Sequence, residues 1–346
     1  MRQAFVLMTA MPPTKGHRNL IRFAAQLSEA VTVILCTQPG EPFAAARYWS
    51  LVQATNRMAN VSVQRIHKVL PQEPEGAEGF WDMWAGFLHT FGFRKGDYIV
   101  ASEPYGVRLA EEVDGIFMPY DLNRTITYTK GTKVREDYRF YWDDILPEFR
   151  PHLKKSVTIF GAESVGKTTT AQGLADDMQN TKWYFEWARP YLESVGAEVT
   201  HEKMVNIWHG QLALQAMAER DRDSEFDIFD TDLFSTVGYW EMYDPDNVPA
   251  GLYEDADAYQ SDLYVILSSD IPFEPDPLRY GGNVRESSDQ YWIDLCERFD
   301  LPYVYVKDGA NFAYTRIKAV QKILLDKWPG DELQYTRIGK EYESHV

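Results

Sequence analysis

A short run of residues, Gly161 to Thr168, carries the clearest chemistry in this sequence. Its letters, GAESVGKT, fit GxxxxGK[ST], the pattern of loops that bind phosphate. The glycines let backbone N–H groups face an anion, Lys167 adds a full positive charge, and the hydroxyl of Thr168 can ligate magnesium. Residues 157–160 predict a buried strand before the loop, and residues 169–178 predict a helix after it, which is the context the pattern requires.

Residues 161–168 are called the P-loop below, and they predict a site for a nucleoside triphosphate, with ATP as co-substrate. We expect Lys167 to be catalytic, because its charge can stabilise a phosphoryl group during transfer. The residues expected to bind ATP in this half of the chain are Gly161, Ala162, Glu163, Ser164, Val165, Gly166, Lys167, Thr168 and Thr169.

Carboxylates cluster downstream, where a short apolar strand is predicted to end. The segment from Glu225 to Asp232 places Asp230 best to hold Mg²⁺, or water bound to it, opposite Thr168. We therefore expect Mg²⁺ as a cofactor, with Thr168 and Asp230 as its ligands. Asp232 is the second candidate and is also expected to bind the substrate. Solvated aspartates at a strand end are the alternative.

Two polar segments are expected to complete this site. Glu186 follows a second strand, where a carboxylate can accept the proton of an acceptor hydroxyl, and Arg189 is expected to bind the substrate. The alternative for Glu186 is a helix cap. Farther on, Arg279 and Arg285 lie among glycines and suit a lid that closes over ATP. An ordinary basic loop is the alternative there.

The first half of the chain has a second candidate site after its first strand, residues 4–8. Residues 9–17, TAMPPTKGH, follow at the strand's carboxyl end, where open α/β sheets bind nucleotides. Gly16 permits close approach of a ligand, and His17 at a helix start can stabilise charge on phosphate oxygens, which makes it a catalytic candidate. A capping Thr14 followed by an exposed histidine explains these residues equally well.

A later segment favours the catalytic interpretation. Thr14, Gly16 and His17 resemble the [HT]xGH signature of the nucleotidyltransferase superfamily, and Thr132 and Arg135 match the spacing of its late ISxTxxR segment. A guanidinium fork and a hydroxyl at a helix start both suit phosphate oxygens. The residues expected to bind ATP in this half are Met8, Thr9, Thr14, Gly16, His17, Lys130, Thr132 and Arg135.

Trp81 and Trp84 are spaced to share one helix face. Burial in the core explains such a pair most simply. The sharper hypothesis is that Trp84 binds substrate by stacking on a flat, positively charged pyridinium ring.

Bulk properties set the class of protein. Apolar strands alternate with helical patterns in both halves, which predicts an α/β fold with mainly parallel sheets: a Rossmann-like domain over residues 1–152, a P-loop kinase domain over 153–330 and a polar tail over 331–346. The net charge of −17 disfavours nucleic acid as a partner. The sequence shows neither a signal peptide nor a membrane span, which indicates a cytoplasmic enzyme. Its two cysteines are expected to be reduced. The sequence leaves open whether the protein forms a homo-oligomer.

Taken together, the two halves resemble NadR-type bifunctional enzymes, in which a nicotinamide-nucleotide adenylyltransferase is joined to a ribosylnicotinamide kinase. The resemblance runs from Phe5 to Trp328 and includes the SEPYG run from Ser102 and the DTDL run from Asp230. It implies two ATP-dependent steps: phosphorylation of nicotinamide riboside, and adenylyl transfer to nicotinamide mononucleotide, which gives NAD and pyrophosphate. Because the chain starts at the first strand, the resemblance does not imply the helix-turn-helix repressor domain or a role in DNA binding.

Two alternatives stay open. Met8 and Lys130 stand where the superfamily usually has Gly and Ser. These departures favour an active riboside or nucleoside kinase whose first domain is a degenerate, regulatory module. A nucleotide-sensing switch is a different class, and it predicts slow ATP turnover that the riboside does not stimulate.

Overall fold

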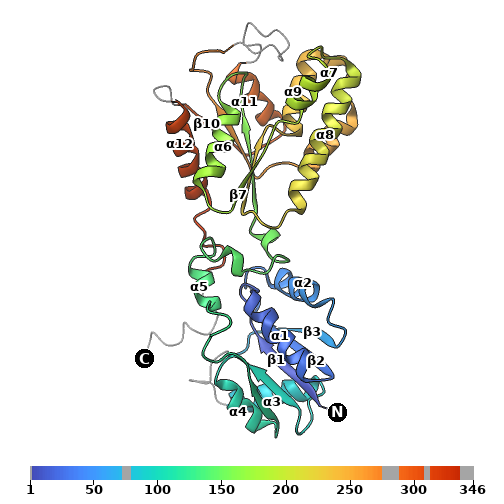
Figure 1. The fold of residues 1–346 in the computed structure, drawn as a ribbon, viewed down its shortest axis with the longest axis vertical. Helices are drawn as coiled ribbons and strands as arrows, with labels where there is room; N and C mark the ends of the chain where they lie inside the picture. Colours follow the sequence, from blue (N-terminus) through green and yellow to red (C-terminus); the bar gives the residue numbers. More distant parts are fainter. Residues whose placement is uncertain (1, 72–78, 275–287, 308–311, 336–346) are drawn as a thin grey trace. The chain divides into compact units, whose positions relative to one another are not determined.

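The computed structural model describes residues 2–71, 79–274, 288–307 and 312–335. The chain forms two compact units (Figure 1): the first runs through Leu153 and resumes at Gly330, and the second is Lys154–Pro329. Within the described residues, no helix is long and apolar enough to pass through a bilayer.

The first unit contains a five-stranded sheet in the order β3-β2-β1-β4-β5, and every neighbouring pair is parallel. Each strand is followed by a helix, and α5 is the last of these helices along the chain (Figure 1). The elements are β1 (Gln3–Met8), α1 (Lys15–Leu27), β2 (Ala30–Thr37), α2 (Ala44–Thr55), β3 (Val61–His67), α3 (Phe80–Thr90), β4 (Tyr98–Ala101), α4 (Tyr105–Glu112), β5 (Ile116–Pro119) and α5 (Gly131–Glu136).

Both faces of this sheet are buried, because side chains on β1 alternate between two apolar clusters. Val6 packs in one cluster with Ile21 of α1 and other residues of α1 and α2. Phe5 packs in the other with Trp84 of α3 and with residues of α4. Helices therefore cover both faces, as a parallel sheet requires.

The second unit has its own parallel sheet, in the order β10-β9-β6-β8-β7. Its core is one large cluster in which Val157, Ile228 and Val265 of the three central strands are fully buried. The elements are β6 (Lys155–Phe160), α6 (Lys167–Asp177), β7 (Thr181–Tyr184), α7 (Ala188–Val195), α8 (His201–Arg220), β8 (Phe226–Asp230), α9 (Leu233–Tyr243), α10 (Ala250–Ala258), β9 (Leu263–Leu267), α11 (Asp289–Arg298), β10 (Tyr303–Val306) and α12 (Phe312–Lys327).

This architecture confirms the predicted α/β class with two parallel sheets. It also fixes where ligands can bind, because strand order reverses at β1 in the first sheet and at β6 in the second. In open α/β sheets, the crevice for ligands lies at the carboxyl end of the strands at such a reversal. The loops that follow β1 and β6 are the two that the sequence singles out.

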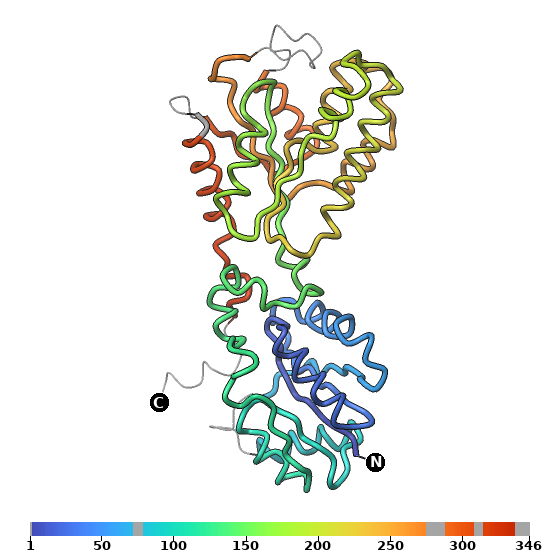
Figure 2. The backbone as a smooth tube through the Cα atoms, in the orientation of Figure 1, coloured from blue at the N-terminus to red at the C-terminus, as the bar shows by residue number. Residues whose placement is uncertain are grey.

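The start of the C-terminal segment packs differently from the predicted polar tail. Leu333 is fully buried with Val134, Trp142 and Phe149 of the first unit. The backbone trace shows the chain returning to this unit after α12 (Figure 2). An apolar leucine in a polar stretch is what anchors it, since burying one such side chain contributes roughly 2 kcal/mol.

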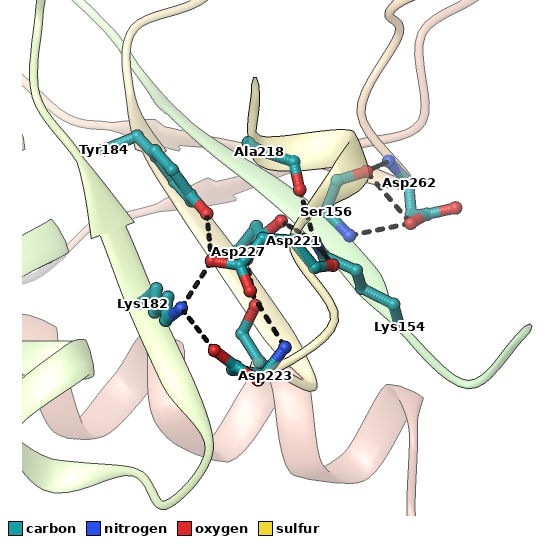
Figure 3. A network of polar contacts seen from close by, with 10 residues as sticks. Lys154, Ser156, Lys182, Tyr184, Ala218, Asp221, Asp223, Asp227 and Asp262 are labelled. Carbon is teal, nitrogen blue, oxygen red and sulfur yellow. Dashed lines mark hydrogen bonds and ion pairs between the residues drawn. The ribbon is translucent and has the colours of Figure 1, made fainter. Parts of the chain in front are cut away.

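A buried polar network holds the first residue of the second unit (Figure 3). The Lys154 ammonium donates to the carbonyl oxygens of Ala218 (2.5 Å) and Asp221 (2.9 Å), at the C-terminal end of α8. It also pairs with the Asp227 carboxylate at 2.5 Å, and both side chains are at least nine-tenths buried. Burial raises the pKa of Asp227, whereas Lys154 and a hydrogen bond from Ser224 oppose that rise. The network therefore depends on Lys154 to compensate a buried carboxylate and the negative end of a helix.

We predict that Lys154→Met lowers the free energy of unfolding of the second unit by roughly 3–5 kcal/mol, because it leaves Asp227 charged and unpaired. Hydrogen exchange of the β8 amides measures this. Lys182→Met is the matched control: Lys182 pairs with Asp221 and Asp223 in the same network but is 41% exposed, so its loss should cost no more than about 1 kcal/mol. Equal losses for the two variants would contradict the prediction.

Candidate active sites of the two units

The P-loop connects β6 to α6, and two of its glycines are required by geometry. Gly161 has φ +130°, and a Cβ there would lie 2.7 Å from the carbonyl oxygen of Leu267 on β9. Gly166 has φ +82° and forms the N-cap of α6. Any other residue type would be strained at both positions. The loop can therefore pass close to β9 and direct its amides, with the N-terminus of α6, toward an anion.

The functional side chains of the P-loop are already engaged. The Lys167 ammonium donates to the carbonyl oxygens of Gly161 (3.0 Å) and Ala162 (2.9 Å). The hydroxyl of Thr168 donates to the Asp230 carboxylate at 2.5 Å. Thr168 and Asp230 are 62 residues apart in the sequence. The structure thus brings the lysine and the hydroxyl of the P-loop together with a carboxylate at the end of another strand.

Asp230 ends β8 and is 2% exposed. Burial, followed by the negative charge of Glu186, raises the pKa of Asp230 to about 6. Its Oδ1 atom accepts no hydrogen bond from any described residue. A buried carboxylate oxygen with spare acceptor capacity, beside a threonine hydroxyl, fits a magnesium ion, which prefers one or two carboxylates plus phosphate oxygens. No group of three or more His, Cys, Asp or Glu that could hold a metal by itself occurs among the described residues.

A cavity of about 470 Å³ opens beside the P-loop. Its polar lining includes Glu186, Arg189 and Asp230, three residues that the sequence singles out. Its lining also includes a stacked tyrosine pair of α9. The apolar and aromatic part of the lining comprises Leu192, Val199, Met204, Ile207, Tyr239 and Tyr243. A cavity lined by both kinds of side chain suits an acceptor that carries both polar groups and a flat ring.

Asp232 is placed differently from the prediction that it binds substrate. It is 1% exposed and does not line the cavity. Its carboxylate caps α9 by accepting from the Ser235 amide at 2.9 Å, and it also accepts from the Tyr264 hydroxyl at 2.8 Å. We correct the assignment: Asp232 is a buried helix cap, because its carboxylate is taken up by the amide at the start of α9 and by the Tyr264 hydroxyl.

Gln211 and Thr231 are among the cavity residues that sequence patterns do not single out. Gln211 of α8 accepts from the Trp187 amide and donates to the Thr231 carbonyl oxygen, both at 3.3 Å. It thus spans the segments that carry Glu186 and Asp230. Thr231 has φ +79°, which is strained for a β-branched residue. A lone glutamine within a helix gives no sequence signal, and backbone strain gives none either.

The expected lid residues Arg279 and Arg285 lie outside the described residues.

In the first unit, His17 is held as a hydrogen-bond donor. The Thr14 amide donates to its Nδ1 atom at 3.0 Å, so Nδ1 is unprotonated and the proton lies on Nε2. The Thr14 hydroxyl lies 2.8 Å from the same nitrogen. Burial, then the charges of Arg124 and Arg135, lower the pKa of His17 to about 4. The imidazole is therefore neutral near pH 7, and Nε2–H is available for a phosphate oxygen.

The late segment reaches the same loop, as the sequence predicts. Arg135 donates to the Met11 carbonyl oxygen at 2.8 Å and to the Thr132 hydroxyl at 3.2 Å. Lys130 is exposed and forms the N-cap of α5. A Cβ on Gly16 would lie 2.9 Å from the side chain of Thr127, so only glycine fits beside this segment.

Arg47 is a further residue that the sequence analysis misses. This α2 side chain is fully buried, pairs with Glu41 and donates to the Thr9 carbonyl oxygen at 3.1 Å. It supports the loop after β1, where Met8 is 8% exposed. An arginine in an alanine-rich helix looks like a surface residue in sequence, so nothing there signals its burial.

Trp84 is 6% exposed and packs beside Phe80 and Phe87, with ring centroids 6.2 and 5.9 Å away. This burial supports the core interpretation. The indole Nε1 is nevertheless buried without a hydrogen-bond partner among the described residues. Stacking of Trp84 on a substrate stays a prediction.

Comparison with known proteins places these sites in context. Residues 156–311 match a family described as an AAA domain. The chain is homologous to the trifunctional NAD biosynthesis/regulator protein NadR of Salmonella typhimurium, with 25% identity over 78% of this chain and 67% of the relative. The NadR protein of Escherichia coli is 26% identical over 70% of this chain and 61% of the relative. The chain thus spans about two thirds of the length of these curated relatives.

Solved structures show the same fold over nearly the whole chain. A NadR protein in complex with NR aligns with a TM-score of 0.62 and 21% identity, covering 93% of this chain and 96% of that one. A NadR protein in complex with NAD and AMP-PNP aligns with a TM-score of 0.63, also at 21% identity, covering 98% and 99%.

The low pKa of His17 predicts a pH-dependent stability of the first unit. Between pH 6.5 and about 4 the unfolded chain binds a proton at His17 and the folded chain does not. Stability should therefore fall as the pH falls through this window. Hydrogen exchange of the β1 amides in the wild type and in His17→Gln measures it, and the variant should show a shallower decline. His209→Gln, at an exposed position of α8, is the control. A decline as steep in His17→Gln as in the wild type would contradict the prediction.

Proposed function

We propose that this protein is a bifunctional enzyme of NAD salvage. The second unit phosphorylates nicotinamide riboside with ATP, and the first unit transfers the adenylyl group of a second ATP to nicotinamide mononucleotide. The observation that carries the proposal is a pair of loops with phosphate-binding sequence patterns, one at the strand reversal of each parallel sheet. Homology to NadR proteins over most of the chain supports the same pair of reactions.

In the kinase reaction, the P-loop amides and Lys167 bind the triphosphate while the cavity holds the riboside. Glu186 accepts the proton of the 5′-hydroxyl, the new bond forms between that oxygen and the γ-phosphorus, and ADP leaves with the electron pair of the broken bond. Mg²⁺ held by Thr168 and Asp230 would neutralise charge on the phosphate oxygens. Arg189 lies in the same cavity and adds positive charge near the acceptor. The tyrosine pair of the lining is the proposed contact for the flat ring.

In the adenylyl transfer, the 5′-phosphate oxygen of the mononucleotide attacks the α-phosphorus and pyrophosphate leaves. His17 donates from Nε2 to a phosphate oxygen as charge grows there, and it needs no change of protonation state. Arg135 and Thr132 approach from the other side of the loop. Catalysis here rests on positioning and charge neutralisation, without a covalent intermediate.

The proposed partners are small molecules: ATP, nicotinamide riboside, nicotinamide mononucleotide and NAD. The net charge of −17 makes nucleic acid a poor ligand, and local cations still give each site its own positive potential. We propose a cytoplasmic location, where both ATP and these nucleotides occur.

The central test is incubation with nicotinamide riboside, ATP and Mg²⁺, with mononucleotide and dinucleotide quantified separately. Lys167→Ala should lower mononucleotide formation by about 100-fold or more, and His17→Ala should do so for NAD formed from supplied mononucleotide. Each variant should leave the other reaction within about twofold, because the two residues belong to separate units and share no described hydrogen-bond partner. His209→Ala and Lys318→Ala are exposed controls. If the wild type forms mononucleotide but no NAD, the result would favour a kinase with a degenerate first domain. Met8 and Lys130 are the residues that favour this alternative.

Asp230→Asn should raise the Mg²⁺ concentration needed for half-maximal kinase activity and lower kcat by about 100-fold, because the amide keeps the shape and loses the charge. Adenylyl transfer should not change. Asp232→Asn is the matched control: it weakens the α9 cap and should lower stability without moving the Mg²⁺ requirement. An unaltered requirement in Asp230→Asn would exclude Asp230 as a metal ligand.

A further inference from the structure

Arg316 of α12 is a buried charge that the reactions above do not use. Its side chain is 1% exposed. The guanidinium donates from Nη1 to the carbonyl oxygen of Val165 at 2.6 Å. From Nη2 it donates to Ser268, at 2.8 Å to the carbonyl oxygen and 3.0 Å to the hydroxyl, and to the Asp270 carboxylate at 2.5 Å. One side chain thus joins the P-loop to the segment after β9, which the sequence separates by more than a hundred residues.

The contact with Val165 constrains the part of the P-loop that faces phosphate. The peptide between Val165 and Gly166 is planar and trans, so its C=O and N–H point in opposite directions. By holding the carbonyl oxygen on its own side, Arg316 turns the Gly166 N–H to the other side. Gly166 is the N-cap of α6, the position from which an amide can meet a bound anion.

The other contacts hold a wall of the cavity. Asp270 and Ser268 precede Ile271 and Pro272, which line the cavity together with Glu274. The Glu274 amide in turn donates to the Ser164 hydroxyl of the P-loop at 2.9 Å. The segment 268–274 is therefore bound to the P-loop at both of its ends, once through Arg316 and once directly.

We propose that Arg316 is a positioning residue for ATP in the second unit. It does not contact the nucleotide; it sets the direction of the Gly166 amide and the distance between the P-loop and residues 268–274. The planar guanidinium fork is needed because a single ammonium cannot reach all these acceptors in fixed directions. The assignment of the bound nucleotide rests on the proposed kinase function, whereas the geometry of the P-loop does not.

The test compares Arg316→Met and Arg316→Lys with Lys318→Met in the full chain. Lys318 lies on the same helix and forms an exposed ion pair with Asp177 of α6 at 3.0 Å. Its variant therefore weakens the α12–α6 contact without touching the P-loop. Both Arg316 variants should raise the KM for ATP in the kinase reaction by about 10- to 100-fold, the effect of losing one or two hydrogen bonds to a charged ligand. The KM for the riboside should rise less than the KM for ATP, because the cavity wall keeps its direct bond to the P-loop through Glu274. Lys318→Met should match the wild type in both.

Equilibrium binding of AMP-PNP separates this inference from the proposed function. Calorimetry on the wild type and on Lys167→Ala identifies the P-loop site, and its dissociation constant should rise in both Arg316 variants. If the wild type phosphorylates no riboside, the proposed function fails. The ratio of the AMP-PNP dissociation constants of the Arg316 variants and the wild type still decides the role of Arg316. Lower thermal stability with unchanged AMP-PNP affinity would overturn the proposal, as would wild-type affinity in Arg316→Lys, which would show that charge alone suffices. Where Arg316→Met fails to fold, the lysine variant gives the decision.

Discussion

The presentation of backbone amides to an anion is the constraint on which both halves of this molecule depend. Backbone N–H groups of a loop can face a phosphate when the carbonyl oxygens of the loop are satisfied by other donors. In the second unit, that satisfaction comes from Lys167, which bonds the carbonyl oxygens of Gly161 and Ala162, and from Arg316, which bonds Val165. In the first unit, Arg47 and Arg135 bond those of Thr9 and Met11. Cationic side chains therefore hold carbonyl oxygens of both loops, and two of them, Arg47 and Arg316, are at most 1% exposed.

Burial also sets the electrostatics of each site, with opposite outcomes. Asp230 and His17 both have pKa values moved toward the neutral form by desolvation. For His17, neutrality is the useful state, because Nε2–H then acts as a donor with a fixed tautomer. For Asp230, a raised pKa marks a carboxylate that lacks compensating charge, which a metal ion shared with ATP would supply. The same physical effect thus prepares one site for hydrogen bonding and the other for a cation.

Much of the fold follows from patterns that are local in sequence. Short apolar runs predict the central strands because buried parallel strands need apolar side chains on both faces. Element ends depend on capping as well as on apolar pattern: α1 begins at Lys15, ahead of its first buried residue, Leu20, because Thr14 and His17 form a capping box. The sequence around Leu333 predicts a polar tail, since one leucine among polar residues has no periodicity, whereas the structure buries that leucine. Asp232 was misassigned because spacing alone does not say which way a turn directs a carboxylate.

By itself, the sequence determined the two candidate phosphate-binding loops, their glycines and the residues that follow each central strand, because these depend on the chemistry of a few neighbouring positions. Only the tertiary structure decided which distant side chains complete them: Gln211 between two strand ends, Arg47 behind the first loop and Arg316 behind the second. It also decided that Trp84 and Asp232 are buried. The physical reason is that burial and hydrogen-bond direction depend on contacts between segments far apart in the chain, which no local pattern records.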